Sequence, residues 1–235
     1  MRRVIVRWSG RLSLVVVGAW AGAAADAPLS AQATVRGQVR LIERAGAPSA
    51  DLTDVIVALE GEAATAKRPA WMDRATVGMR RREFEPHVQL VGVGGSVAYP
   101  NQDPFSHNVF SNSALGAFDL GLYRSGKTRS ATFNAPGVYA VYCNIHARMV
   151  NYVVAVRTPY VTRARANGSF EIGDVPPGTW MLRVWHERAA EHVETVRVTG
   201  DGVMLTVALD ARGYVAKAHG NKFGQPYTAT RADRY

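Results

Sequence analysis

The chain has 235 residues, a formal net charge of +9 at pH 7 and a single cysteine, Cys143. One cysteine excludes an internal disulfide framework, and the lack of lysine-rich blocks or a nucleic-acid motif argues against DNA or RNA as a partner. The basic charge favours an acidic protein partner or an anionic surface, although a merely soluble basic surface explains it equally well.

The amino terminus has the residue order of a secretory signal peptide. Four arginines in the first eleven residues precede an uncharged run from Leu12 to Ala25, and small residues follow. This run is shorter than the roughly 18 to 20 residues that span a bilayer, which disfavours a permanent anchor. We expect residues 1–33 to be removed, with cleavage after Ala33 or a few residues earlier. The mature chain would then carry a formal charge of about +6, lack a transmembrane segment and be periplasmic or secreted.

Short alternating segments typical of β-strands then fill most of the chain. Residues 33–42 and 55–61 predict two strands, and the basic stretch after them predicts one or two helical turns within Trp71–Met79. Its densest charge, Arg80–Arg82, indicates a solvated connecting face rather than a functional patch. We therefore expect residues 34–83 to form an amino-terminal hairpin and a basic connecting segment, and we leave open which sheet the hairpin joins.

The strand pattern sharpens between residues 84 and 157. Two predicted strands flank a turn at Gly94-Gly95, and two more flank a Pro136-Gly137 turn before the second of them ends at Cys143. Residues 149–156 alternate strictly and predict a further strand.

Residues 158–212 predict a second, smaller unit. It contains a long strand in which Trp180, Leu182 and Val184 alternate toward the core, and its last two strands flank Gly200–Gly202 as a hairpin. Residues 213–235 are low in aliphatic side chains and predict a tail that is loosely ordered or draped over the surface. The whole pattern indicates an all-β fold of antiparallel sheets packed as sandwiches.

Three candidate metal ligands lie at the end of the predicted strand that finishes at Cys143 and in the loop that follows it. Cys143, His146 and Met149 follow one another at intervals of three residues. They offer a thiolate, an imidazole and a thioether, which suit copper cycling between Cu(I) and Cu(II). A trigonal site needs one more histidine, and a sandwich can bring the strand end at His107 beside this loop. Taken singly, each residue is explained as core or surface, but the four together favour a copper site.

The region from about Phe84 to Val156 resembles a cupredoxin, the blue copper fold of plastocyanin, pseudoazurin and amicyanin. The matching segments are "VGVGGSVAYPNQD", "HN", "APGVYAVYC" and a C-x-x-H-x-x-M loop whose short final gap resembles that of amicyanin. The wider pattern resembles exported bacterial proteins of the methylamine utilisation or plastocyanin-like type. The segment "NGSFEIGDVPPGTWMLRVWHE" is similar to a carboxypeptidase-regulatory-like β-sandwich. The resemblance thus implies a cupredoxin Greek-key β-sandwich at residues 84–157 and a second small β-sandwich at residues 158–212.

The resemblance also implies a role for each residue of a single type 1 copper site. His107 would be the first imidazole ligand, Cys143 the equatorial thiolate, His146 the second imidazole and Met149 the axial ligand. Asn108 would tie the two ligand loops together and help to hold the thiolate by hydrogen bonding.

Such a site has no open coordination position, which favours outer-sphere electron transfer over bond-making chemistry. We expect the electron to pass through His146, within an apolar docking collar of Phe105, Ile145, Ala147 and Phe110. Ile145 departs from the family pattern, because many relatives have proline immediately before the second histidine ligand. We expect the absence of that proline to loosen the loop without removing a ligand. The partner would be a redox protein such as a cytochrome or dehydrogenase, and the basic charge favours an acidic one.

Enzymatic copper chemistry is disfavoured by the residue inventory. Multicopper oxidases and copper nitrite reductases need further histidines, commonly as H-x-H, and this chain has six histidines and no H-x-H. A dinuclear site with two bridging thiolates needs a second cysteine. Two other functions stay open, a periplasmic copper-binding or delivery protein and a non-catalytic structural or interaction module. The lack of Met-rich or His-rich tracts argues mildly against delivery, and the intact ligand set argues against the module.

Overall fold

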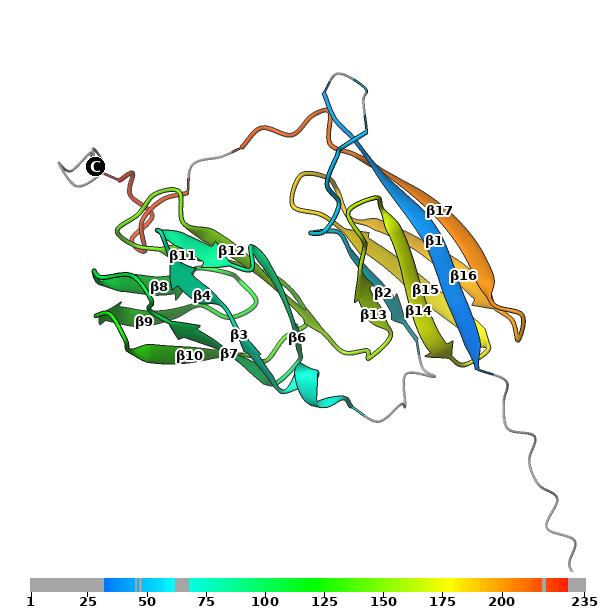
Figure 1. The fold of residues 1–235 in the computed structure, drawn as a ribbon, viewed down its shortest axis with the longest axis horizontal. Coiled ribbons are helices and arrows are strands. Elements are labelled where there is room, and N and C mark those ends of the chain that lie inside the picture. Colours follow the sequence, from blue (N-terminus) through cyan, green and yellow to red (C-terminus); the bar gives the residue numbers. More distant parts are fainter. Residues whose placement is uncertain (1–31, 45, 47, 62–67, 217–218, 228–235) are drawn as a thin grey trace, which may run out of the picture.

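The computed structural model describes residues 32–44, 46, 48–61, 68–216 and 219–227 (Figure 1). The expected signal peptide therefore lies almost wholly outside the described residues. Within these ranges the chain is built of β-strands with one short 3₁₀ helix, η1 (Ala70–Met72), which agrees with the expected all-β class. The described residues include no helix with the length and apolar character that a membrane crossing requires.

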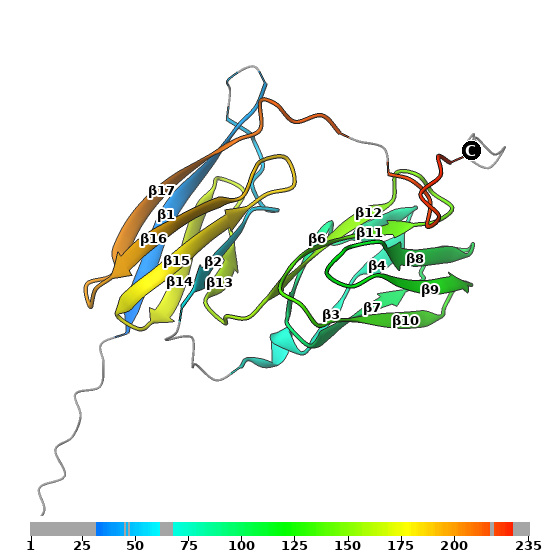
Figure 2. The same ribbon diagram turned by 180° about the vertical axis from the view of Figure 1, so that it is seen from behind.

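The central unit is a sandwich of two sheets with a small ribbon beside them (Figure 2). The larger sheet has the strand order β6 (Val88–Gly92), β12 (Val150–Val156), β11 (Gly137–Cys143), β8 (His107–Ser111), β9 (Phe118–Tyr123). The facing sheet has the order β10 (Thr128–Phe133), β7 (Gly95–Pro100), β3 (Arg74–Thr76), and the ribbon pairs β4 (Gly78–Arg80) with β5 (Glu83–Glu85). Their inward side chains form one apolar core, which includes Tyr99, Phe133, Val141 and Cys143.

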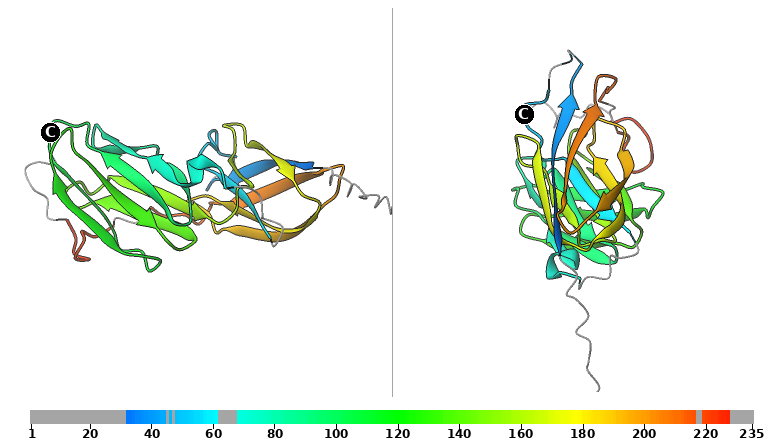
Figure 3. Two further views of the ribbon diagram at one scale, coloured as in Figure 1. Left: turned by 90° about the horizontal axis from the view of Figure 1, so that it is seen from below. Right: turned by 90° about the vertical axis from the view of Figure 1, so that its right-hand side faces the viewer.

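The flanking unit is a second sandwich, placed end to end with the first along the long axis of the molecule (Figure 3). One sheet has the order β14 (Ser169–Val175), β1 (Ala33–Ile42), β17 (Val203–Asp210). The other has the order β13 (Val161–Arg163), β2 (Ile56–Glu60), β15 (Gly178–Trp185), β16 (His192–Val198). Trp180, Leu182 and Val184 are buried between the two sheets, as the alternation along β15 predicts.

Three local expectations differ from the structure. The first two strands do not form a hairpin, because β1 lies between β14 and β17 while β2 pairs with β13 and β15. The last two strands belong to different sheets, so the turn at Gly200–Gly202 crosses the sandwich. Within Trp71–Met79 the helical part is confined to the end of η1, and strands β3 and β4 follow it. Alternation identifies the core face of a strand and leaves its pairing partner open.

The described part of the carboxy-terminal tail also has a defined position. Residues 219–227 pack against the central unit next to β8, β9 and β11, through contacts from His219, Lys222 and Tyr227. These residues come from beyond the flanking unit in sequence. The chain therefore returns to the central sandwich after completing the second one.

The two units share an apolar interface because β12 is buried on both faces. Val153 and Ala155 point into the core of the central sandwich. Val154 and Val156 point the other way and pack in a cluster with Ile56 of β2 and residues of the flanking unit. Burial on both faces also means that residues 153–156 are continuously buried, which differs from the strict alternation expected for residues 149–156.

An ion pair crosses the same interface. The Nε2 atom of His87 lies 3.0 Å from Oε2 of Glu187. The hydrogen bond to Glu187 raises the pKa of His87 although burial opposes it. Burial works to raise the pKa of Glu187, but the hydrogen bond and charge of His87, with smaller contributions from His186 and Tyr152, together lower that pKa. The charged pair is therefore favoured in the folded state at mildly acidic pH.

We expect Glu187→Gln to lower the apparent unfolding temperature more at about pH 5.5 than at about pH 8.5. The pKa of His87 is higher in the folded protein than the value of about 6.5 in the unfolded chain. The ion pair therefore contributes its full stability below about pH 6.5, and this contribution is lost as the pH rises through the folded-state pKa of His87. The two side chains are partly exposed, so the difference should be about 1 kcal/mol or less. Differential scanning calorimetry at the two pH values measures it.

Glu171→Gln is the matched control, because it breaks an exposed ion pair with Arg36 that contains no histidine. Its effect should be the same at both pH values. An equal effect of Glu187→Gln at both pH values would contradict the assignment.

Candidate metal centre

Strand pairing brings the candidate ligands to one end of the larger sheet. β8 begins at His107 and β11 ends at Cys143, and the two antiparallel strands are in register with Cys143 opposite Val109. Residues 144–149 then connect β11 to β12 and carry His146 and Met149. The residues of the candidate site therefore come from one end of two neighbouring strands and from one short loop.

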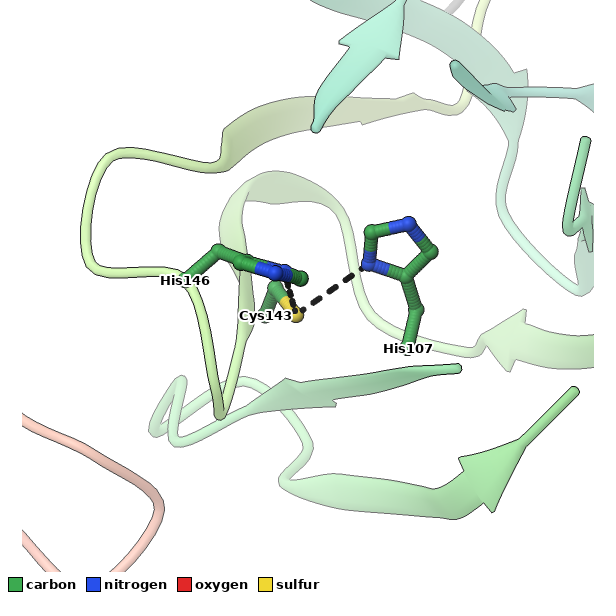
Figure 4. A group of neighbouring side chains, drawn as sticks. All are labelled: His107, Cys143 and His146. Atoms are coloured by element: carbon green, nitrogen blue, oxygen red, sulfur yellow. Dashed lines mark hydrogen bonds between the residues drawn. The ribbon is translucent and has the colours of Figure 1, made fainter. Parts of the chain in front are cut away.

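The side chains of His107, Cys143 and His146 converge on one point (Figure 4). The Cys143 Sγ atom lies 3.6 Å from Nδ1 of His107 and 3.4 Å from Nδ1 of His146. One ligand atom from each residue lies within 4.8 Å of the other two, and no second cluster of this kind occurs among the described residues. His107 and Cys143 are fully buried, while His146 is partly exposed.

Met149 lies next to this group at the end of the loop. It is buried and packs in the same apolar cluster as Cys143. Two backbone hydrogen bonds tighten the loop around it, from the Cys143 N–H to the Met149 carbonyl and from the Met149 N–H to the His146 carbonyl, both 3.1 Å long. The loop thus closes tightly on the cluster.

A buried carboxylate, Asp103, fixes the orientation of the His107 ring. The Nε2 atom of His107 lies 2.8 Å from Oδ2 of Asp103, and both side chains are almost completely inaccessible. Because Asp103 can only accept, this bond places the proton of a neutral ring on Nε2 and leaves the Nδ1 lone pair facing Cys143. Second partners of this kind are typical of metal-binding histidines.

The charges of this pair follow from burial and hydrogen bonding. Burial lowers the pKa of His107 and outweighs the opposite effect of Asp103, so the imidazole is neutral and able to bind a metal. Burial works to raise the pKa of Asp103, but N–H groups of Arg82, His107 and Arg81 lower it overall. Asp103 is therefore an anion that is held by three donors.

Asp103 also holds a strained turn. Its two oxygens accept the backbone N–H groups of Arg81 and Arg82, at 2.6 and 2.9 Å. Both arginines have left-handed backbone conformations, with φ of 56° and 63°, which cost about 1–2 kcal/mol per residue for a side chain other than glycine. The hydrogen bonds to the buried carboxylate offset this strain. One carboxylate therefore connects the turn between β4 and β5 to the ring of His107.

The arginine turn lies at the rim of the candidate site, where the charge pattern predicted only a connecting face. The Arg82 guanidinium lies 5.2 Å from the centre of the Phe105 ring. Arg81, Arg82 and Arg148 line a hollow of about 550 Å³ together with His146 and Met149. The densest positive charge of the sequence is thus exposed, as expected, but it borders the candidate metal ligands.

Backbone N–H groups surround the sulfur of Cys143. Burial raises the pKa of this thiol, and hydrogen bonds from the N–H groups of Ile145, Asn108 and His146 partly counter the effect. Bonds of this kind stabilise a thiolate, the form that binds a metal. The metal-free site therefore favours the thiol but is already arranged to accept the anion.

Asn108 connects the two ligand segments mainly through its backbone. Its carbonyl accepts the N–H of Asn144 at 3.0 Å, and its N–H is one of the donors to the Cys143 sulfur. Its side-chain amide donates instead to Asp119 on β9 at 2.6 Å. The backbone of Asn108 thus connects the segment of His107 to the segment of Cys143. Its side chain is held by Asp119, a support that the sequence pattern did not reveal.

The expected apolar collar has three members near the site and one elsewhere. The Phe105 ring is half-buried, with its centre 5.3 Å from that of His107 and 5.6 Å from that of His146. Ile145 and Ala147 are exposed on the loop. Phe110 is fully buried, so it cannot line the surface around His146 as expected. Val109 and Cys143 point into the core, so Phe110, which lies opposite Tyr142, points to the other face of the larger sheet, where Lys222 and Phe223 of the tail lie near it.

Comparisons with known proteins give one curated relative and several related structures. The chain is similar to amicyanin-alpha of Methylorubrum extorquens, with 30% identity over 100 residues, which cover 41% of this chain and 84% of that protein. No family model matches the chain. A purple cupredoxin from Nitrosopumilus maritimus is 22% identical, with 34% of this chain and 98% of that one covered and a TM-score of 0.32. A copper-containing nitrite reductase from Thermus scotoductus is 26% identical, and the match covers 41% of this chain and 25% of that one with a TM-score of 0.33.

We expect Asp103→Asn to move the proton of the neutral His107 ring from Nε2 to Nδ1 in the metal-free protein. With the new amide oxygen in the Oδ1 position it would accept from Arg81, and the NH₂ group in the Oδ2 position, which Arg82 and His107 share, would donate to Nε2 and so reverse the tautomer. Long-range proton–nitrogen NMR spectra distinguish the two tautomers. Loss of a charged acceptor should also cost about 1–3 kcal/mol of stability.

Asp119→Asn is the control, because Asp119 supports the site without touching His107. It should leave the His107 tautomer unchanged. Retention of the Nε2–H tautomer in Asp103→Asn would show that this carboxylate does not determine the tautomer of the His107 ring.

Proposed function

The chain belongs to the cupredoxin family, and we propose that it is an exported copper protein that carries single electrons between redox partners by outer-sphere transfer. The proposed ligands are His107, Cys143, His146 and Met149. The observation that carries the proposal is the convergence of two imidazole Nδ1 atoms on one buried thiol. When bound, one copper ion would supply the Cu(II)/Cu(I) couple.

The donor set fits copper better than the metals that favour oxygen. A thiolate, two imidazoles and a thioether are soft to intermediate ligands, whereas magnesium and calcium prefer carboxylates and carbonyls. The carboxylate that bonds to a proposed ligand, Asp103, is already engaged by three donors and faces the far side of the His107 ring. The residues present therefore fit a type 1 copper ion.

The burial of the site supports a carrier rather than an enzyme. His107, Cys143 and Met149 are almost completely buried, so little of the proposed ligand set is exposed to a substrate. His146 is the one partly exposed member of the group. A partner can approach its imidazole edge without entering the site, which is sufficient for outer-sphere transfer.

The surface around His146 supports weak and transient docking. We propose that Phe105, Ile145 and Ala147 form its apolar part, and that Arg81 and Arg148 supply a basic rim. Small interfaces of this composition are typical of short-lived redox complexes. The basic rim favours an acidic face on the partner. The resemblance to methylamine utilisation proteins makes a periplasmic dehydrogenase or cytochrome the first partner to test.

We expect the purified mature protein to show intense blue or green thiolate-to-copper absorption after loading with Cu(II). Cys143→Ser should abolish the colour, because the absorption requires the sulfur ligand. Visible spectroscopy together with metal analysis measures both. Failure to bind stoichiometric copper would refute the proposal, and tightly held Cu(I) that resists oxidation would favour copper delivery.

Met149→Leu is the companion variant in this experiment. It replaces the weak axial thioether with a side chain of similar volume, so copper should stay bound and the reduction potential should rise. Complete loss of copper from Met149→Leu would mean that the axial role is misassigned.

We expect Arg81→Glu combined with Arg148→Glu to slow electron transfer to an acidic cytochrome by about tenfold at low ionic strength. The difference should shrink as salt is added, because salt screens exposed charges. Stopped-flow kinetics over a series of salt concentrations measures both effects. Arg197→Glu, an exposed change on β16 of the flanking unit, is the control and should have a small effect. Equal salt slopes for all three proteins would exclude this rim as the docking surface.

A further inference from the structure

The described tail, residues 219–227, contacts the loop that carries the proposed ligands (Figure 1). The ring of His219 stacks on Tyr142, the residue before Cys143, with 4.0 Å between centres and 21° between planes. The ring of Tyr227 meets His219 edge to face at 5.2 Å. We call residues 219–227 the clasp.

The clasp hydrogen-bonds directly to the peptide that follows the proposed thiolate ligand. The hydroxyl of Tyr227 donates to the carbonyl of Cys143 at 2.7 Å. The N–H of the same peptide group, which belongs to Asn144, donates to the carbonyl of Asn108 at 3.0 Å. The Cys143–Asn144 peptide is therefore fixed at its oxygen by the clasp and at its nitrogen by the segment that contains His107.

Lys222 attaches the clasp to both ligand segments at once. Its backbone N–H donates to the side-chain oxygen of Asn144 at 2.8 Å. Its ammonium group lies 2.6 Å from one carboxylate oxygen of Asp119, and the other oxygen accepts the side-chain amide of Asn108 at 2.6 Å. These bonds form a closed chain from the clasp through Asp119 and Asn108 to the Cys143–Asn144 peptide and back.

We propose that Tyr227 and Lys222 are positioning residues, which hold the loop of Cys143 and His146 against the segment of His107 and so keep the proposed metal ligands in place. The hydrogen bonds of the clasp described above go to the Cys143 carbonyl, to Asn144 and to Asp119, so it acts through the peptide at Cys143 and through Asn108. It takes over part of the restraint that a proline would give at Ile145, which precedes His146 in the loop. The hydrogen bonds of the clasp are observed whether or not copper binds, but the role of holding metal ligands rests on the proposed copper site.

The test compares Tyr227→Phe with Phe223→Leu in the full mature chain. Tyr227→Phe removes one hydroxyl and keeps the ring, whereas Phe223 belongs to the same clasp but is 74% exposed. Hydrogen exchange of the metal-free protein, followed by mass spectrometry over residues 143–149, measures the opening of the loop. Loss of the bond to the Cys143 carbonyl, and of the 3.2 Å contact of the same hydroxyl with Nδ1 of His219, should make this exchange about fivefold faster in Tyr227→Phe. The change in Phe223→Leu should be smaller, because that substitution removes only an exposed ring 5.3 Å from the ammonium group of Lys222.

A second measurement follows copper in the loaded protein. The rate at which a strong chelator removes copper should rise by about the same factor in Tyr227→Phe, and Lys222→Met should act in the same direction. Loop exchange that is equal in Tyr227→Phe, Phe223→Leu and the unaltered protein would overturn the clasp. The exchange measurement needs no metal, so it tests the clasp even in a chain that proves unable to bind copper.

Discussion

The site depends on the hydrogen bond between Asp103 and His107. A buried imidazole beside a thiol can have either nitrogen protonated, and only one tautomer leaves Nδ1 available to face the sulfur of Cys143. The carboxylate selects that tautomer because it can accept but not donate. Its own burial is tolerated because the turn at Arg81 and Arg82 supplies two further donors. The arginine turn is consequently part of the support of the candidate metal centre, and its exposed side chains line the same hollow as His146.

The second sandwich contributes to this support from a distance. β12 leaves the ligand loop and is buried on both faces, with Ala155 in the central core and Val154 against the flanking unit. The flanking unit therefore anchors the strand on which the loop ends, and the chain beyond it supplies the clasp that contacts the strand on which the loop begins. Both ends of the loop are restrained by parts of the chain that lie outside the central sandwich.

The sequence predicted most of the strands and the group of residues that converge, because both leave local signals. Alternation marks half-buried strands such as β1, and a cysteine and a histidine three residues apart at a strand end mark a ligand loop. Strand partners were not predictable, since β1 has the same pattern whether it pairs with β2 or with β14. Asp103, Asp119 and the clasp residue Tyr227 were missed for a related reason. Their roles come from contacts between distant segments, and nothing in their local sequence distinguishes them from surface residues.

The same restraints bear on the choice between carrying electrons and delivering copper. A protein that delivers a metal must open its site to release the ion, whereas a carrier benefits from ligands that stay in one geometry in both oxidation states. Here His107 is fixed by Asp103, and the Cys143–Asn144 peptide is held at both its oxygen and its nitrogen. The two bonds at this peptide hold the loop against β8 and against the tail, so opening the loop costs their net free energy, while His107 stays fixed on β8. A site built in this way is suited to retain its metal, and that favours the electron carrier.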